Sequence, residues 1–224
     1  AMPMAASMQL LGVDRYTDVN TDGWIEDGDS CRYPTIDIAP ISQGADAHRI
    51  KIAEGEWLWM ENRDNTDFDS RLPGHGLLVS VQNSNVGDLE GNAVNHDVGM
   101  PWLYVVEADG GDELQRAADK GSATDPFQSS DSFGASGEAV RDSHGRLVQW
   151  TANISEGSFN NLLVNLTRPS CDSTFEVLPP SGAVRTLPGE SFEFAFRGGN
   201  GCQPVISLNV SDGRKVVGEL SPVE

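Results

Sequence analysis

The chain has 224 residues, 34 of them acidic and 15 basic, which gives a formal net charge of −19. A surface this negative repels phosphate backbones and anionic lipids, so nucleic acid is excluded as a favoured partner. The apolar runs are only a few residues long, and the sequence predicts no membrane span. Hydrophobic residues make up 38%, while 24 glycines and 12 prolines favour short elements joined by turns, as in a mostly β protein.

Residues 1–7 have the composition of a vector remnant or a disordered segment, and we expect them to take no part in the fold. Over residues 8–168, apolar and polar residues alternate with the period that indicates strands, which predicts a β-rich first domain. One short helix is predicted at 112–119, where Asp112 is a candidate cap and Gly121 follows the end. The predicted strands are 35–41, 48–53, 56–62, 76–82, 103–108, 147–154 and 161–166.

A domain boundary is predicted near residue 168, because short and evenly spaced apolar segments follow it. We expect residues 169–224 to form a small β-sandwich module of the immunoglobulin-like or polycystic-kidney-disease-like type. Cys171 and Cys202 flank most of this module, and a disulfide between them suits an exported protein. It would close a loop of about 30 residues, worth roughly 3–4 kcal/mol. Cys31 is left over, either as a buried thiol or as the partner of a cysteine in another segment.

The segment 18–29 has the spacing of a calcium-binding loop, with oxygen donors at loop positions 1, 3 and 5 and a glycine at position 6. A calcium ion takes roughly six to eight hard oxygen ligands, and this spacing wraps them around one centre. Two amphipathic helices do not flank the segment, so we expect a calcium loop without a full helix–loop–helix unit. The alternative is an acidic surface turn. The predicted ligands are Asp18, Asn20, Asp22, the main-chain carbonyl of Trp24, and Asp29.

A second acidic cluster begins at Glu107 and continues to Asp119 and Asp125. Carboxylates on its glycine-rich turn, those of Asp109 and Asp112, are candidates for a second calcium. The alternative is that Asp112 only caps the predicted helix.

The four histidines are not spaced as zinc ligands on one helix. The zincin type of catalytic site needs two histidines one helical turn apart, and this spacing does not occur. His75, His96 and Asp97 can meet only through tertiary contacts, and isolated histidines are more often structural. The Gly-x-Ser-x-Gly nucleophile motif and the phosphate-binding glycine loops are missing as well. A pair of strand-end carboxylates, Glu61 and Glu107, is the remaining weak candidate for hydrolytic chemistry.

Several segments from residue 57 onward form an ordered set of motifs: 57–63 (Trp-Leu-Trp-Met-Glu-Asn-Arg), Phe68-Asp69, 72–79, His96 with 105–110 (Val-Val-Glu-Ala-Asp-Gly), 125–127 (Asp-Pro-Phe) and 153–155 (Asn-Ile-Ser). In these motifs the chain resembles the immune-inhibitor-A-type secreted zinc metallopeptidases. The resemblance covers residues 50–168, and its motifs keep the order that they have in that family. The strand that follows the Leu-Pro-Gly-His-Gly-Leu-Leu-Val motif departs from the family, because Ser80 to Asn83 stand where the family commonly has Trp-His-x-Asp.

The resemblance implies an exported bacterial protein with bound calcium, and it places this region after the catalytic helix, in the distal β-rich part of the peptidase unit. A small β-domain often follows there, and zinc belongs to the upstream catalytic part. We therefore expect an extracellular, non-catalytic and calcium-binding C-terminal portion of such a peptidase. Its expected partners are the upstream catalytic domain of the same precursor and a protein substrate or surface ligand.

A structural polar cluster is expected where the Glu-Asn-Arg segment ends its strand. Arg63 offers five donors to a buried carboxylate, such as that of Glu61 or Glu107, and Asn62 lies beside it. The main rival function is a stand-alone calcium-dependent module that binds carbohydrate or protein. A carbohydrate-binding face would group several of the five tryptophans on an open platform. A hydrolase with paired carboxylates is a third candidate, and it would need two acids with separated pKa values in one cleft.

Overall fold

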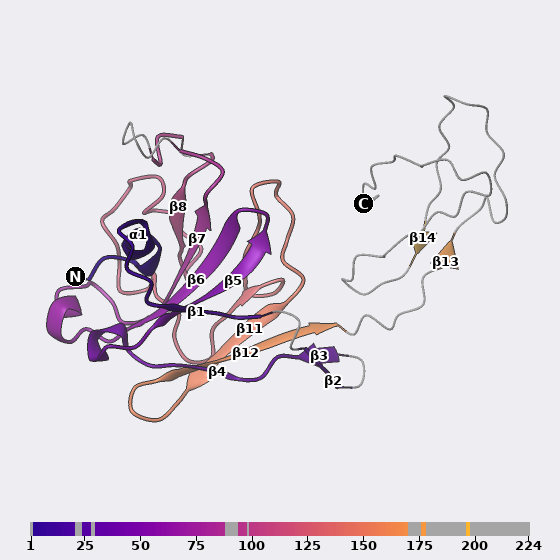
Figure 1. Cartoon of the computed structure of the whole chain (residues 1–224), viewed down its shortest axis with the longest axis horizontal. Helices are drawn as coiled ribbons and strands as arrows, with labels where there is room; N and C mark the ends of the chain where they lie inside the picture. The colour runs from indigo at the N-terminus through magenta and orange to yellow at the C-terminus, as the bar shows by residue number, and fades with distance from the viewer. Residues whose placement is uncertain are drawn as a thin grey trace.

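A computed structural model describes residues 2–20, 24–27, 30–87, 94–97, 99–169, 176–177 and 196–197. Within these residues the protein is mostly β, with two mixed sheets, a two-stranded ladder and one short α-helix (Figure 1). The predicted fold class is confirmed at this level. No helix in the described part of the chain is long and apolar enough to cross a membrane.

The first sheet has five strands, and its neighbours are antiparallel except for one parallel pair at an edge, β1 with β5. Its centre is the long β6–β7 pair, in which Met60 lies opposite Val79. The strands in spatial order are β1 (Tyr16–Asp18), β5 (Ala47–Ala53), β6 (Glu56–Arg63), β7 (Gly76–Asn83) and β8 (Leu103–Val106).

The second sheet is built around the antiparallel β11–β12 hairpin, to which the first part of the chain adds short strands. The parallel pair β9–β10 forms one edge. The strands in spatial order are β10 (Glu138–Ala139), β9 (Ser132–Gly134), β11 (Thr151–Glu156), β12 (Leu162–Pro169), β3 (Ser30–Arg32) and β2 (Ile25–Asp27), with β4 (Ile36–Ile38) also paired to β12.

The C-terminal module is described at only two short strands, β13 (Glu176–Val177) and β14 (Phe196–Arg197), which pair antiparallel. The sandwich type predicted for residues 169–224 lies outside the described residues. The predicted disulfide between Cys171 and Cys202 lies outside them as well. Cys31 is buried with a free thiol, which agrees with one of its two expected states.

The main hydrophobic core lies between the two sheets. Alternate residues of β6 and β7, such as Leu58 and Val79, are fully buried there against residues of the second sheet, such as Ile38 and Val164. Aromatic rings close one part of this core, where Phe133 packs against Phe127 at 5.1 Å and against Trp150 at 6.1 Å between ring centroids. Period-two patterning therefore places one face of each sheet inside the molecule.

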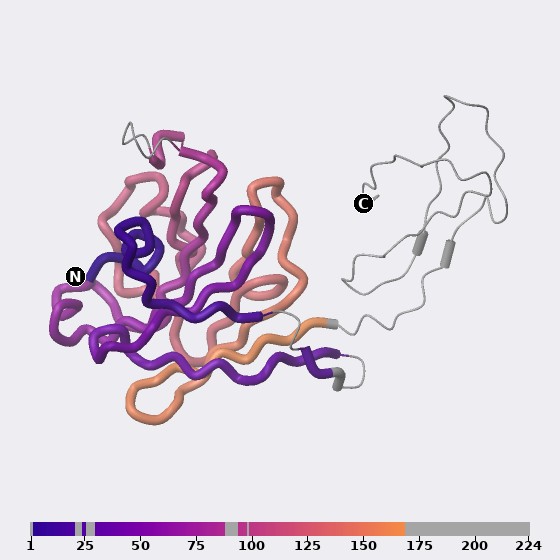
Figure 2. The backbone as a smooth tube through the Cα atoms, viewed as in Figure 1, coloured from indigo at the N-terminus to yellow at the C-terminus, as the bar shows by residue number. Residues whose placement is uncertain are grey.

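A second, smaller core covers the opposite face of the first sheet. The helix α1 (Ala5–Leu10) packs against Trp59, which is fully buried, and its small residue Ala6 is fully buried as well. Figure 2 shows the indigo N-terminal segment lying against the purple strands of this sheet. The expectation that residues 1–7 take no part in the fold was therefore wrong for residues 2–7.

The polar end of β6 explains why this N-terminal segment is held in place. Arg63 is 2% exposed and pairs with the carboxylates of Glu61 and Asp69, both of which are buried. It also donates to the main-chain carbonyl oxygens of Met2 and Pro3, each at 3.2 Å. In turn, main-chain N–H groups of the segment donate to the two acids, at 2.8 Å each. Buried charges are tolerated only when they are paired and hydrogen-bonded, and this segment supplies four of the hydrogen bonds.

All seven predicted strands match observed strands, with shifts at their ends. Strand 35–41 shortens to β4, and strand 147–154 starts four residues later as β11. The 3₁₀ helices η2 (Ile41–Gln43) and η3 (Asp67–Asp69) were not predicted.

The helix predicted at 112–119 was wrong. Residues 113–117 form consecutive turns instead. Asp112 and Ala117 have positive φ angles of 51° and 53°, which a right-handed helix excludes. The N–H groups of Glu113 and Leu114 donate to the side chain of Glu107, so a distant carboxylate takes the capping role expected of Asp112.

Replacement of Arg63 by methionine should lower the free energy of unfolding by about 3–5 kcal/mol, because it leaves two buried carboxylates without a cation. Urea denaturation of the variant and the parent protein measures the change. The matched control is Lys51→Met, which breaks an ion pair between Lys51 and Glu54 whose side chains are 48% and 93% exposed. The control should lose less than about 1 kcal/mol. Equal small losses in both variants would contradict a structural role for the buried pair.

Candidate metal centre

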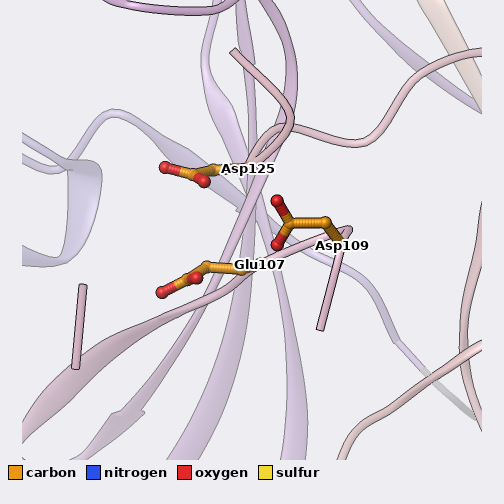
Figure 3. Close-up of side chains that lie close together, drawn as sticks. All are labelled: Glu107, Asp109 and Asp125. Carbon is orange, nitrogen blue, oxygen red and sulfur yellow. The ribbon is translucent and has the colours of Figure 1, made fainter. Parts of the chain in front are cut away.

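Three carboxylates from two separate stretches of the chain meet beyond the end of β8 (Figure 3). Glu107 directly follows β8, Asp109 lies on the next turn, and Asp125 comes from the segment that leads to Phe127. One oxygen of each carboxylate lies within 4.8 Å of the others. Glu107 and Asp125 are 1% and 5% exposed, whereas Asp109 is exposed.

Main-chain hydrogen bonds fix the distance between the two stretches. The N–H of Ala108 donates to the carbonyl of Asp125 at 2.9 Å, and the N–H of Gly110 donates to the carbonyl of Glu107 at 3.0 Å. Gly110 has a φ angle of 70°, so this tight turn suits glycine. A Cβ atom on Gly111 would lie 3.2 Å from Oε2 of Glu107. Glycine at 110 and 111 therefore lets the turn close beside the carboxylate.

Each carboxylate is oriented by donors from its own neighbourhood. Glu107 accepts N–H groups at both oxygens, at 2.8 Å each. Asp125 accepts the N–H of Ser122 at 2.8 Å and its hydroxyl at 2.6 Å. Asp109 accepts the hydroxyl of Thr124 and the N–H of Gly111, and these hydrogen bonds hold the pKa of Asp109 below its usual value. The exposed member of the group is therefore ionised under ordinary conditions.

A hard cation suits this arrangement better than other ligands. Among the described residues no lysine or arginine forms an ion pair with any of the three carboxylates. Converging negative charges repel one another, and a bound cation removes that repulsion. Oxygen donors alone favour calcium or magnesium over zinc, which prefers nitrogen and sulfur. The group supplies three such donors, and water or main-chain carbonyls would complete a calcium shell.

The second predicted calcium site stays a prediction, and the structure places its two predicted residues differently. Asp109 belongs to the group, but Asp112 does not, and Glu107 and Asp125 take its place. Asp112 instead lines a cleft that also contains Tyr104 and Glu138. Burial, followed by the nearby charge of Asp112, raises the pKa of Glu138. The acidic run in the sequence indicated the right neighbourhood, but only tertiary contacts could select its members.

The first predicted calcium loop is described at Asp18, Asn20 and Trp24, while Asp22 and Asp29 lie outside the described residues. Asp18 accepts a hydrogen bond from Nε of Arg49 at 2.5 Å. Calcium in this loop stays a prediction.

The side chain of Trp24 is half-buried, and its ring contacts two neighbouring residues. Its ring packs edge-on against Tyr33 at 5.9 Å, and the guanidinium of Arg168 lies 4.7 Å from the ring centroid. Cation–π contact of this kind fixes the tryptophan side chain, while its main-chain carbonyl is the atom predicted to bind calcium.

The predicted polar cluster separates into three parts. Glu61 and Arg63 pair as expected, and burial raises the pKa of Glu61 even though Arg63 opposes this shift. Asn62 projects to the other face of β6, where it donates to the carbonyl oxygens of Ile38 and Asn160. Of the two carboxylates considered as partners of Arg63, Glu61 takes that role, whereas Glu107 lies in the acidic triad. Asp69, which the Phe-Asp motif contained, completes the arginine pair instead.

The histidines do not gather into a metal site. His75, His96 and His144 are exposed, and His48 is half-buried, with its pKa lowered mainly by burial. Within the described part of the chain, the acidic triad is the one group of three or more His, Cys, Asp or Glu side chains close enough to share an ion. Comparison of the chain with protein-family models, curated proteins and solved structures returns no match. The resemblance to immune-inhibitor-A-type peptidases therefore rests on the residues alone.

Replacement of Asp109 by asparagine should weaken calcium binding at the triad about tenfold, since ligand charge sets the affinity of such sites. Calorimetry with calcium measures this, and thermal unfolding should show about 2.7 kcal/mol of stabilisation at a hundredfold excess over the dissociation constant. Because the hydrogen bonds from Thr124 and Gly111 lower the pKa of Asp109, the contribution of this carboxylate to binding should be lost only as the pH falls through that lowered pKa.

The matched control is Asp14→Asn, which removes an exposed carboxylate outside the triad. It should leave the calcium isotherm unchanged. An equal effect of the two variants would mean that calcium responds to total charge and not to this group.

Proposed function

We propose that this chain is the non-catalytic, calcium-binding C-terminal portion of a secreted zinc metallopeptidase of the immune-inhibitor-A type. One observation carries the proposal: segments that resemble the family and lie far apart in the sequence meet around the acidic triad. Leu77 and Phe127 exchange main-chain hydrogen bonds of 2.9 Å in both directions. Two residues before Phe127, the main-chain carbonyl of Asp125 accepts the N–H of Ala108, which lies within the Val-Glu-Ala-Asp-Gly motif. Three of the segments that carry the resemblance, around Leu77, Ala108 and Asp125, are therefore hydrogen-bonded to one another in the fold.

The chemistry of the described residues agrees with a supporting role. The acidic triad suits calcium, which crosslinks distant loops without performing hydrolysis. The buried Arg63 pairs with two carboxylates and donates to the main chain of the N-terminal segment, so it acts as a structural tie. In this proposal the upstream part of a longer precursor supplies the zinc and the catalytic helix. The present chain stabilises and positions that part outside the cell, and it contacts substrate or a surface ligand.

A stand-alone calcium-dependent binding module is the alternative. For carbohydrate, it would need an open aromatic platform, and the tryptophans do not provide one. Trp59, Trp102 and Trp150 are buried. The other two are half-buried, and the guanidinium of Arg49 lies 4.0 Å from the ring centroid of Trp57. This observation favours the peptidase reading over carbohydrate binding.

A hydrolase with paired carboxylates is disfavoured on similar grounds. Glu61 and Glu107 are each 1% exposed, so neither is open to a substrate. Glu61 is bound to Arg63 and to the N–H of Ala5, and both oxygens of Glu107 accept main-chain N–H groups.

The proposal predicts that the purified chain does not cleave casein, with or without added zinc and calcium. A longer precursor that contains a His-Glu-x-x-His helix should cleave it, and deletion of residues 50–168 from that precursor should abolish cleavage. Zymography and peptide release measure both activities. Chelator-sensitive cleavage by the chain alone would overturn the proposal, as would full activity of the deleted precursor in its folded state.

A further inference from the structure

The outer side of β8 is an edge of the first sheet. β8 is the last strand in the spatial order, and its inner side pairs with β7 (Figure 1). The N–H of Asn83 donates to the carbonyl of Trp102 at 2.8 Å, which fixes the residues of this segment that face β7. Hydrogen-bonded residues alternate along an antiparallel pair. Tyr104 therefore bonds to β7, while the main-chain groups of Leu103 and Val105 point outward.

Asn95 shows how this edge accepts a partner. Its Nδ2 donates to the carbonyl oxygen of Leu103 at 2.7 Å, and the N–H of Leu103 donates to its Oδ1 at 2.9 Å. A side-chain amide thus makes the two hydrogen bonds that a residue of an added strand would make. Two residues further on, the outward N–H and carbonyl of Val105 bond to no described residue. An unpaired main-chain donor and acceptor at a sheet edge form a template for another chain.

A slot of about 390 Å³ lies beside Val105. Leu103 packs against the smaller core under α1, and Val105 shares its face of the sheet because side chains two residues apart point the same way. Met4 from the N-terminal segment and Leu114 from the turns after β8 add to the apolar wall of the slot. The residue opposite Val105 in an added strand would place its side chain on this same face, and therefore in the slot.

The surroundings of the slot are negatively charged. No lysine or arginine lines it. The exposed acids Asp97, Asp112 and Glu113 lie within two residues of lining residues in the sequence, and none of them forms an ion pair in the described part of the chain. Arg116 lies in the same stretch and donates to the main-chain carbonyls of Gly111 and Asp112. Since the whole chain carries −19, a second copy is repelled and a basic segment is attracted.

We propose that the edge of β8 binds an extended, positively charged polypeptide segment as an added antiparallel strand. One residue of the segment exchanges two main-chain hydrogen bonds with Val105, and its apolar side chain fills the slot. Basic residues on either side of it meet the exposed acids. In this mode of recognition the main-chain bonds supply affinity, and the pocket for alternate side chains supplies selectivity. The inference does not depend on the proposed function.

The test is a titration of the ¹⁵N-labelled chain, with calcium present throughout, using the blocked peptide Lys-Lys-Val-Lys-Lys. Saturable shifts should appear at the amides of Val105 and Leu114, and the Val105 amide should exchange with solvent more slowly. Methylation of the valine nitrogen removes the N–H that bonds to the carbonyl of Val105, and it should weaken binding at least about tenfold. The matched control carries the methyl on the nitrogen of the next lysine, whose N–H points away from β8, and it should keep its affinity.

The variant Leu114→Ala removes part of the apolar wall and should weaken the parent peptide about three- to fivefold. Its matched control is Leu147→Ala, an exposed leucine outside the slot, which should leave the affinity unchanged. A peptide with glutamate in place of each lysine should not bind.

Equal binding of the two methylated peptides would mean that charge alone attracts the segment, and it would overturn the proposal. An unchanged affinity in Leu114→Ala, or saturable shifts confined to other surfaces, would overturn it as well. Shifts of Val105 that depend on protein concentration without peptide would assign the edge to a second copy of the chain and overturn the assignment to a basic segment.

Discussion

The burial of β6 on both faces is the constraint on which the rest of the structure depends. A strand in this position must find partners for every polar side chain that it carries, and β6 ends in Glu61, Asn62 and Arg63. Glu61 and Arg63 point to one face, where they bind Asp69 and the main chain of residues 2–5. Asn62 points to the other face and holds β4 and the β11–β12 turn. Three polar residues thus connect the N-terminal segment, the first sheet and the second sheet.

The same strand order also places the candidate metal centre. β7 pairs with β6 along its whole length, and the second residue of β7, Leu77, pairs with Phe127. This contact brings Asp125 beside the end of β8, where Glu107 and Asp109 already lie. The triad therefore closes a loop that starts and ends on the first sheet, and a cation there would fix the loop to the sheet. A calcium-stabilised scaffold needs this kind of site, whereas a catalytic zinc centre needs nitrogen ligands and an open position.

The sequence predicted the long strands well because each buries one face and alternates clearly, as β7 and β11 do. The strands β2, β9 and β10 have only two or three residues, which is too few to show an alternation of apolar and polar side chains. They are defined by pairing with other strands alone. The predicted helix failed because the amides of Glu113 and Leu114 bind Glu107, a contact that local propensity does not contain. α1 was overlooked because its buried residues are mainly small alanines, whose burial depends on the partner Trp59. For the site, the acidic run around Asp109 was visible, but its pairing with Asp125 follows from the fold.

The most direct measurement of the central claim is an anomalous difference map from crystals grown with calcium. We expect a calcium peak bounded by the carboxylates of Glu107, Asp109 and Asp125, with oxygen distances of about 2.3–2.6 Å. Calcium peaks found only elsewhere on the chain, with these three carboxylates bound to water alone, would contradict it.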